Sequence, residues 1–424
     1  MHPRTRTTTR VRQTLLAAVF SAVAASASAQ APAGAAPESF GTPSLKELFE
    51  AAWSRQPEAQ AMQARRDAVQ ARRRVADAWT PEPPAFEASH KTDRLTRNDG
   101  ARELEVGITV PLWLPGERRG SAALADAEAT AAESRAGAAR LRLAATIRDA
   151  WWAWQRAGVE VEVARGQLDS ARRIAADVAR RARAGELARA DQHQADGAVA
   201  AAEAAAAQTE AALTVAMQQV KALSGTIPAV LPAAAVAAEP EPSSTETATH
   251  PALAELQDRS AVAERAATLA ATQSRANPEL TLATTRDRGA AGERYGQTVT
   301  LAVRIPFGGG PRHDSRVASA RADALEAQAQ LEIDRARLQS ERDAAQARVD
   351  AARAQLAATE RRAALARETR GFFEKSFRLG ETDLPTRLRI EAEATEAERQ
   401  AARSRIELAA AISAWRQALG LLPQ

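Results

Sequence analysis

Two stretches of alternating apolar and polar residues, each followed by a very long helical pattern, limit what this chain can fold into. In residues 102–119, apolar side chains stand at every second position, and the positions between them are mostly polar or glycine. The apolar set is Leu104, Val106, Ile108, Val110 and Leu112. Residues 295–312 repeat the pattern, with Val299, Leu301, Val303, Ile305 and Phe307 as the apolar set. Because side chains alternate between the faces of a strand, each stretch predicts a strand with one apolar and one polar face.

The first strand ends at Pro111, and a helical pattern follows over residues 117–183. At ~1.5 Å per residue this helix would be roughly 100 Å long, which is too long for a globular domain. Gly185 suits the left-handed cap that ends such a helix, and a second helix is predicted over residues 188–223, before Gly225. Only 4% of the residues are aromatic, a bias typical of long helices and coiled coils.

Proline and glycine positions recur at a fixed spacing, which indicates an internal duplication. The matching pairs are Pro111 and Pro306, Gly185 and Gly380, and Gly225 and Gly420, each 195 residues apart, and Pro57 and Pro251, 194 apart. In each unit the residue pattern predicts the order helix, strand, strand, long helix, helix. The units are residues 44–225, with strands at about 85–93 and 103–112, and residues 250–424, with strands at about 279–286 and 297–307; residues 226–249 link them.

The N-terminus has the pattern of a secretory signal peptide, predicted over residues 1–29: a basic region to Arg12, an apolar run, and small residues. A flexible segment is expected at residues 30–43. Ser44-Leu45-Lys46-Glu47 then predicts a capping box that opens a helix running to about Asp77.

Charge and cysteine content exclude several classes of protein. Four arginines of the signal peptide account for the net charge of +4, and the other arginines interleave with acids, so no basic patch for nucleic acid is expected. The sequence has no cysteine, which excludes disulfides and a lipid on cysteine. No window after the signal peptide approaches about 18 uncharged apolar residues, so any membrane crossing would use strands.

A single copy offers four strands of about ten residues, too few to close a barrel. Tilted strands of that length nevertheless cross a hydrocarbon layer, and strand edges are not tolerated in lipid, so the edges must pair with other copies. Three copies would supply twelve strands. The long helices would continue this barrel as a helical tube.

These features together resemble the TolC-like outer-membrane factor family, also described as outer membrane efflux proteins. The resemblance rests on the duplicated order of elements, on the strand ends Val110-Pro111-Leu112 and Ile305-Pro306-Phe307, and on the hairpin turns 183–187 and 378–384. It implies a mainly α-helical protein with transmembrane β-strands. In this family a trimer forms a 12-stranded barrel in the outer membrane of a Gram-negative bacterium and a long periplasmic α-helical coiled-coil tunnel.

The resemblance also implies a function. The chain would be the outer-membrane exit duct of a tripartite efflux system, passively conducting substrates handed over by an inner-membrane pump and a periplasmic adaptor. The expected partners are two further copies in a homotrimer, the adaptor, the pump and outer-membrane lipid. His250-Pro251-Ala252-Leu253 and residues 307–311 resemble the heavy-metal cation-efflux branch of the family.

Two alternatives come from other classes of protein. A pore-less periplasmic coiled-coil scaffold would explain the helices but not the duplicated alternating strands. The periplasmic adaptor of such a pump also has a helical hairpin, but adaptors lack two equal halves with paired strands.

Three groups of site residues follow from the resemblance. The hairpin tips that would dock the adaptor comprise Arg183, Gly185, Arg378, Leu379 and Gly380. A periplasmic gate is expected at Asp191, six residues after Gly185, where members of the family can carry a gating aspartate. The second repeat has no acidic residue at the equivalent place, and its Arg389 could pair with Asp191. Aromatic residues at the membrane interface are expected at Trp79, Trp113 and Phe307, where strands meet helices.

No enzyme chemistry is predicted, because no nucleophile, base and orienting group recur at a recognisable spacing. No cofactor is expected, and the histidines form no i, i+4 pair, so no metal site within one chain is expected either. Trp151, Trp152 and Trp154 lie inside the long helix and are interpreted as packing residues.

Overall fold

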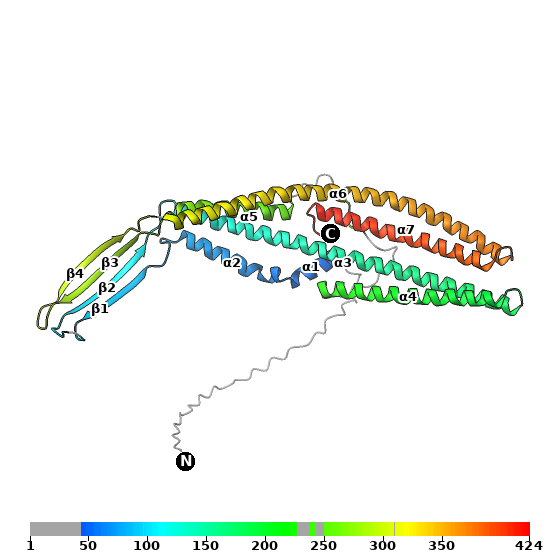
Figure 1. Cartoon of the computed structure of the whole chain (residues 1–424), viewed down its shortest axis with the longest axis horizontal. Coiled ribbons are helices and arrows are strands. Elements are labelled where there is room, and N and C mark those ends of the chain that lie inside the picture. Colours follow the sequence, from blue (N-terminus) through cyan, green and yellow to red (C-terminus); the bar gives the residue numbers. More distant parts are fainter. Residues whose placement is uncertain (1–43, 96, 227–237, 243–249, 309) are drawn as a thin grey trace, which may run out of the picture. The chain divides into compact units, whose positions relative to one another are not determined.

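The computed structural model describes residues 44–226, 238–242 and 250–424, except positions 96 and 309. The elements in chain order are α1 (Leu45–Arg55), α2 (Pro57–Asp77), β1 (Ala85–Thr92), β2 (Arg102–Pro111), α3 (Glu117–Arg183), α4 (Arg189–Ser224), α5 (Pro251–Thr272), β3 (Glu279–Arg288), β4 (Gly296–Arg304), α6 (Gly310–Arg378) and α7 (Leu384–Ala418) (Figure 1). The chain thus consists of long helices with a small antiparallel sheet, which confirms the predicted mainly α-helical fold class with four strands.

Three predicted segments lie wholly or mostly outside the described residues. They are the signal peptide (1–29), the flexible segment (30–43) and most of the linker (226–249). Within the described residues, no helix is both long enough and apolar enough to cross a membrane.

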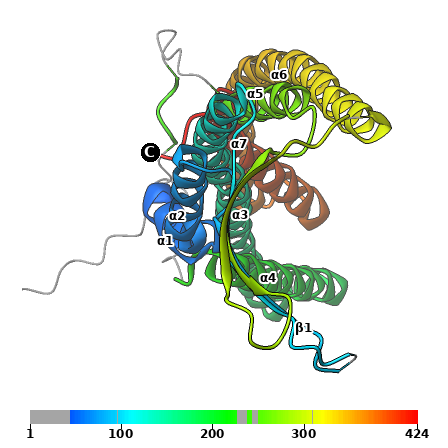
Figure 2. The same ribbon diagram turned by 90° about the vertical axis from the view of Figure 1, so that its left-hand side faces the viewer.

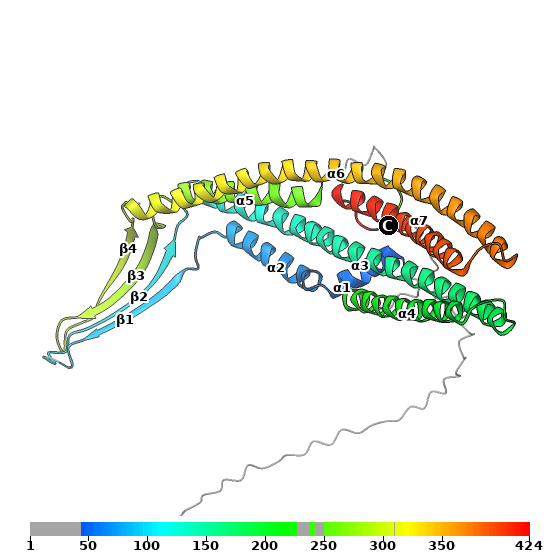
Figure 3. The same ribbon diagram turned by 45° about the vertical axis from the view of Figure 1, so that its right-hand side comes forward.

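The helices pack around α3, which contacts α1, α2, α4, α5 and α7. Seen from the end of the sheet, α2 and α5 lie on different sides of α3 (Figure 2). The hairpins α3–α4 and α6–α7 both turn at the end far from the sheet (Figure 3). The sheet and the two helical turns therefore occupy opposite ends of the same long helices.

The predicted capping box at the start of α1 is confirmed. The Ser44 hydroxyl accepts the Glu47 N–H at 3.2 Å, and the Glu47 carboxylate accepts the Ser44 N–H at 2.8 Å. The single helix predicted to run to about Asp77 is instead divided into α1 and α2. Gln56 adopts an extended conformation with φ −70° and ψ 139°, because the ring of Pro57 disfavours helical geometry in the residue before it.

The predicted glycine caps at both helical turns are confirmed. Gly185 has φ +82° and Gly380 has φ +79°, both in the left-handed region. The N–H of Glu186 donates to the Arg181 carbonyl at 3.0 Å, and the N–H of Glu381 donates to the Ser376 carbonyl at 3.0 Å. Each of these hydrogen bonds closes the last turn of its helix, as expected for a left-handed cap.

The second half of the chain repeats the order of the first, with α5 alone in the place of α1 and α2. Its strand bounds differ slightly from the prediction. β3 extends to Arg288, two residues beyond the predicted end. β4 spans Gly296–Arg304 and ends before the predicted limit at Phe307. Pro306 lies in the missing part, and proline has no N–H to donate to a strand ladder.

The main hydrophobic core lies where α1, α3, α4 and α7 meet. Trp151, Trp152 and Trp154 are buried in it, which confirms their interpretation as packing residues. Trp151 and Trp154 meet edge to face, with ring centroids 5.0 Å apart. Phe49 of α1 packs into the same core.

A buried ion-pair cluster, here called the Glu239 clasp, ties the segment after α4 to α3 and α7. Glu239 accepts two hydrogen bonds from the Arg148 guanidinium, at 2.8 and 2.9 Å. The Ser413 hydroxyl donates to the same carboxylate at 2.5 Å, and Arg416 Nε lies 3.4 Å from it. The side chains of Arg148 and Glu239 are each only 3% exposed. No local pattern in the sequence indicates this cluster.

Candidate functional site

The four strands form one antiparallel sheet in the order β1-β2-β3-β4, so each strand pairs with its neighbours in the sequence. In this register Ile108 lies opposite Phe86 on one side and Leu282 on the other, and Leu282 lies opposite Leu301. In the part of the chain that the structure describes, β1 and β4 each pair on one edge only. The sheet therefore ends in two free edges.

One face of the sheet is apolar and uncovered. Its large side chains lie on the same face in all four strands, because register partners share a face. These exposed residues are Phe86, Leu104, Ile108, Leu282, Val299, Leu301 and Val303. Phe86 and Leu301 are each 70% exposed. An uncovered apolar surface of this extent indicates a protein or membrane interface.

The opposite face is polar and internally bonded. Lys91 on β1 pairs with Glu103 on β2 at 2.8 Å. The hydroxyls of Thr109 and Thr281 are hydrogen-bonded across β2 and β3 at 3.0 Å. The predicted division of the strands into an apolar and a polar face is thus confirmed.

A buried carboxylate at the first residue of α3 joins the two halves of the chain where strands meet helices. Glu117 accepts hydrogen bonds from Gln273 at 2.8 Å and from Asn277 at 2.7 Å. Asn277 also donates to the Leu112 carbonyl at 3.0 Å. This junction fixes how the sheet continues from the helices. The sequence does not indicate this junction, because Glu117 belongs to the first repeat and both of its partners belong to the second.

The three predicted interface aromatics lie in connections between strands and helices: Trp79 between α2 and β1, Trp113 between β2 and α3, and Phe307 between β4 and α6. Trp79 and Phe307 are 94% and 90% exposed, so neither has a packing role within the chain. Trp113 is half-buried, and its indole N–H donates to the Ala78 carbonyl at 3.1 Å. Trp113 therefore also has a structural role that the sequence did not reveal.

The predicted tip residues lie at the two helical turns, and the structure brings the turns together. Leu379 is 75% exposed at the end of α6. A hydrogen-bonded contact connects the hairpins: Arg181 of α3 donates to the Phe377 carbonyl at 3.0 Å, and its guanidinium lies 4.9 Å from the Phe377 ring centroid. A Cβ at Gly185 or Gly380 would meet nothing within 4 Å, so both turns face open space.

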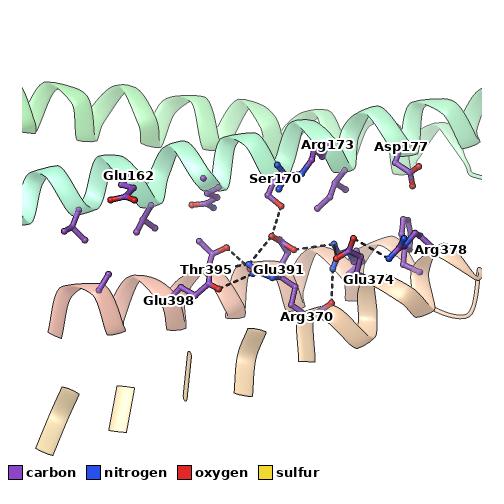
Figure 4. Close-up of a pocket in the computed structure, with 18 of the residues that line it drawn as sticks. Glu162, Ser170, Arg173, Asp177, Arg370, Glu374, Arg378, Glu391, Thr395 and Glu398 are labelled. Atoms are coloured by element: carbon purple, nitrogen blue, oxygen red, sulfur yellow. Dashed lines mark hydrogen bonds and ion pairs between the residues drawn. The ribbon is translucent and has the colours of Figure 1, made fainter. Parts of the chain in front are cut away.

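A groove of about 730 Å³ lies between α3 and the α6–α7 hairpin, a few turns before the tips. Figure 4 shows Ser170 of α3 pointing across it to Glu391 of α7, and the hydroxyl donates at 2.7 Å. Arg387 Nη2 lies 3.5 Å from the same carboxylate, and Arg370 donates to Glu398 at 3.1 Å. No pattern in the sequence indicates this groove, because its charged residues repeat at ordinary helix-surface spacing.

The two predicted gate residues each have a partner on their own helix. The Asp191 carboxylate accepts the Ala188 N–H at 3.0 Å, so it caps the start of α4. Arg389 pairs with Glu393 at 2.7 Å, and both side chains are mostly exposed. Within one chain the described contacts therefore assign Asp191 to helix capping and Arg389 to a surface ion pair.

Titratable groups elsewhere on the helices have pKa values shifted by ion pairing or by burial. Hydrogen bonds from Arg66 hold the pKa of Glu133 below its ordinary value. Burial lowers the pKa of His250 at the start of α5. Among the described residues, no group of three or more His, Cys, Asp and Glu side chains is arranged to hold a metal ion.

Residues 48–226 match the model of the outer membrane efflux protein family, which confirms the predicted resemblance to that family. None of the curated proteins matches the sequence.

Solved structures of outer-membrane proteins share this fold. The outer membrane protein VceC of Vibrio cholerae is 20% identical, with a TM-score of 0.68 over 89% of this chain and 96% of that one. The MtrE outer membrane channel of Neisseria gonorrhoeae, solved in its open state, is 16% identical, with a TM-score of 0.72 over 89% of each chain. The CmeC outer membrane channel of Campylobacter jejuni is 15% identical, with a TM-score of 0.65 over 89% of this chain and 85% of that one. The likeness extends well beyond the part that matches the family model.

Proposed function

We propose that this chain is the outer-membrane exit duct of a tripartite efflux system. The observation that carries the proposal is the uncovered apolar face of a four-stranded sheet at the end of long helices. Such an apolar face is compatible with contact to lipid. Free strand edges are not, because their backbone groups would lack hydrogen-bond partners in lipid. Pairing of β1 in one copy with β4 in the next removes both edges. Three copies supply twelve strands, a number that closes a barrel.

A matched pair of substitutions on β4 tests the membrane assignment. Leu301 lies on the apolar face, and the neighbouring Thr300 lies on the opposite face; both are exposed. Leu301→Arg should block insertion into the outer membrane, because arginine on a lipid-facing strand costs about 2–4 kcal/mol near the bilayer midplane. Thr300→Arg should insert normally, since its side chain would face the water-filled interior. Equal insertion of the two variants, measured by membrane fractionation, would contradict the proposal.

The assembly follows from the free strand edges. In mild detergent the mature protein should be a trimer whose strand content is lost on heating, as intermolecular pairing maintains the strands. A detergent-solubilised monomer with intact strands would contradict the trimer. A protein found in the soluble periplasmic fraction would favour the pore-less scaffold instead.

The helical turns are the proposed docking surface for the periplasmic adaptor, and the gate is proposed near them. The exposed Leu379, the open space around Gly185 and Gly380, and the contact between the two hairpins support a shared tip surface. Substrates handed over by an inner-membrane pump would enter here and diffuse outward without further energy input. Three Asp191 carboxylates near a common axis would attract cations, and an Arg389 could pair with one of them.

Metal cations are the proposed cargo, supported by the resemblance of His250-Pro251-Ala252-Leu253 and residues 307–311 to the cation-efflux branch. A host that lacks its own exit duct, supplied with this chain and its pump and adaptor, should regain resistance to metal salts. Recovery of resistance to organic drugs alone would contradict this assignment.

A further inference from the structure

A row of arginines ends the apolar face of the sheet at the side farthest from the helices, where both strand turns lie (Figure 1). In the register, Arg102 is the partner of Arg288, and Leu104 is the partner of Arg286. Because partners share a face, these three arginines lie on the same face as the apolar side chains. Arg102 and Arg286 are exposed, and Arg288 is half-buried.

The acidic strand residues at the same level, Glu103 and Asp287, lie on the other face. Glu103 is the register partner of both Lys91 and Asp287, and Lys91 forms an ion pair with Glu103 there. In the described part of the chain, none of the three arginines forms an ion pair with a carboxylate. Arg288 Nε donates instead to the Gly100 carbonyl at 3.0 Å. The apolar face thus ends in positive charge that no carboxylate of the described residues neutralises.

An aromatic ring holds two of these guanidinium groups together. The Tyr295 ring centroid lies 4.6 Å from Arg286 Cζ and 5.1 Å from Arg288 Cζ. A guanidinium over an aromatic face is attracted by the ring and loses part of its freedom. Both like charges are therefore held against one ring before any ligand arrives.

The length of the apolar face places this row at a membrane boundary. From Val110 to Arg102 the strand rises about 27 Å at ~3.4 Å per residue. With a tilt of about 40° this corresponds to roughly 20 Å along the membrane normal, against an apolar band about 25 Å tall. When the helical end of the sheet lies at the inner boundary, the arginine backbone lies about 5 Å short of the outer boundary. The long arginine side chains span this distance to the lipid headgroups of the outer leaflet.

We propose that Arg102, Arg286 and Arg288 form a binding site for the phosphate groups of a phosphorylated lipid in the outer leaflet. Guanidinium groups bind phosphate oxygens in pairs of parallel hydrogen bonds, which favours arginine over lysine at such a site. The adjacent apolar face accepts the acyl chains of the same lipid. The inference rests on the proposed outer-membrane function, which fixes the face that meets lipid.

Binding of two forms of lipid A tests the site. Purified trimer in mild detergent is mixed with diphosphoryl lipid A, or with dephosphorylated lipid A of the same acyl chains, and bound lipid is measured by native mass spectrometry. The wild type should bind the diphosphoryl form at least about tenfold more tightly. Arg102→Gln combined with Arg286→Gln should weaken that binding about 25-fold, because each basic residue near an anionic lipid surface contributes about fivefold.

Lys91→Gln is the matched control, since it removes a positive charge at the same level on the opposite face; its binding should stay within about twofold of the wild type. If the double variant fails to assemble, Arg286→Gln alone should weaken binding about fivefold. Equal binding of both lipids, an equal loss in the Lys91 variant, or competition by inorganic phosphate as strong as that by the lipid would overturn the site.

Fractionation of the same cells separates failure of the site from failure of the proposed function. A wild type that lies in the outer membrane but does not distinguish the two lipids overturns the lipid site alone. A wild type in the soluble periplasm overturns the proposed function and this inference with it.

Discussion

Loss of the Glu239 charge should destabilise the fold more than loss of any exposed acid. Glu239→Gln keeps the size of the side chain but leaves the guanidinium groups of Arg148 and Arg416 buried without a carboxylate. These side chains are 3% and 1% exposed, so water cannot replace the lost partner. Removing one partner of a buried ion pair costs about 3–5 kcal/mol.

Unfolding by guanidinium chloride in detergent, followed by tryptophan emission, measures this loss of stability. Trp151 and Trp152 lie one turn after Arg148 in the buried core, so their emission reports on the region that the clasp holds. With a denaturant slope of about 4 kcal/mol per molar, the unfolding midpoint should fall by about 1 M.

Glu133→Gln is the matched control. It breaks a bidentate pair with Arg66 of similar length, 2.7 and 3.0 Å, whose side chains are about half exposed. An exposed pair contributes less than about 1 kcal/mol, so the midpoint should move by less than about 0.25 M. Equal shifts for the two substitutions would refute the reasoning that burial makes the Glu239 clasp costly to break.

Four further predictions follow from single contacts. Leu379→Asp should abolish export, measured as extrusion of substrate from cells that contain pump and adaptor, while Leu379→Met should preserve it; export by Leu379→Asp would place docking elsewhere. In planar bilayers Asp191→Asn should lose cation preference and Arg389→Ala should open more readily, and unchanged selectivity and conductance in both would place the constriction elsewhere. Burial holds the pKa of His250 below its ordinary value, so the folded chain binds this proton less readily than the unfolded chain. The stabilising contribution of neutral His250 is present above about pH 6.5 and is lost as the pH falls through the lowered pKa. Unfolding midpoints at about pH 7.5 and about pH 5 should therefore differ less in His250→Asn than in the wild type. An unchanged difference would contradict this. Ser44→Ala should cost about 1 kcal/mol by removing the cap of α1, measured as faster amide exchange in its first turn, and unchanged exchange would show that the cap contributes little.

Local patterns in the sequence were sufficient to predict most elements of the fold. The alternation around Ile108 predicted a two-faced strand, and Gly185 and Gly380 predicted the helical turns, because each feature depends on residues close in the chain. Pro57 was visible as a repeat marker, yet its effect on the residue before it was not used, and the helix break at Gln56 was missed for that reason.

The contacts that position the site were beyond such reasoning, because they join distant parts of the chain. Glu239 meets Arg148, 91 residues earlier, and Ser413, 174 residues later. Glu117 joins residues of the second repeat more than 150 positions away. Glu239 stands in the predicted linker and Glu117 at the start of a helix, and no local pattern marks either carboxylate as buried. The arginine row likewise becomes apparent only when the register places Arg102 beside Arg288.

The two helical turns also show what kind of residue their glycine positions can accept. Gly185 and Gly380 have φ near +80°, but a Cβ at either position would meet nothing within 4 Å. Gly107 in the sheet is the reverse case, because a Cβ there would lie 3.0 Å from the Ala283 Cβ. At Gly107 the small space limits which residues can replace glycine. At the two turns the positive φ limits them, because L-residues rarely adopt it. A D-alanine introduced by chemical synthesis should fit at Gly380 without strain, while L-alanine should not.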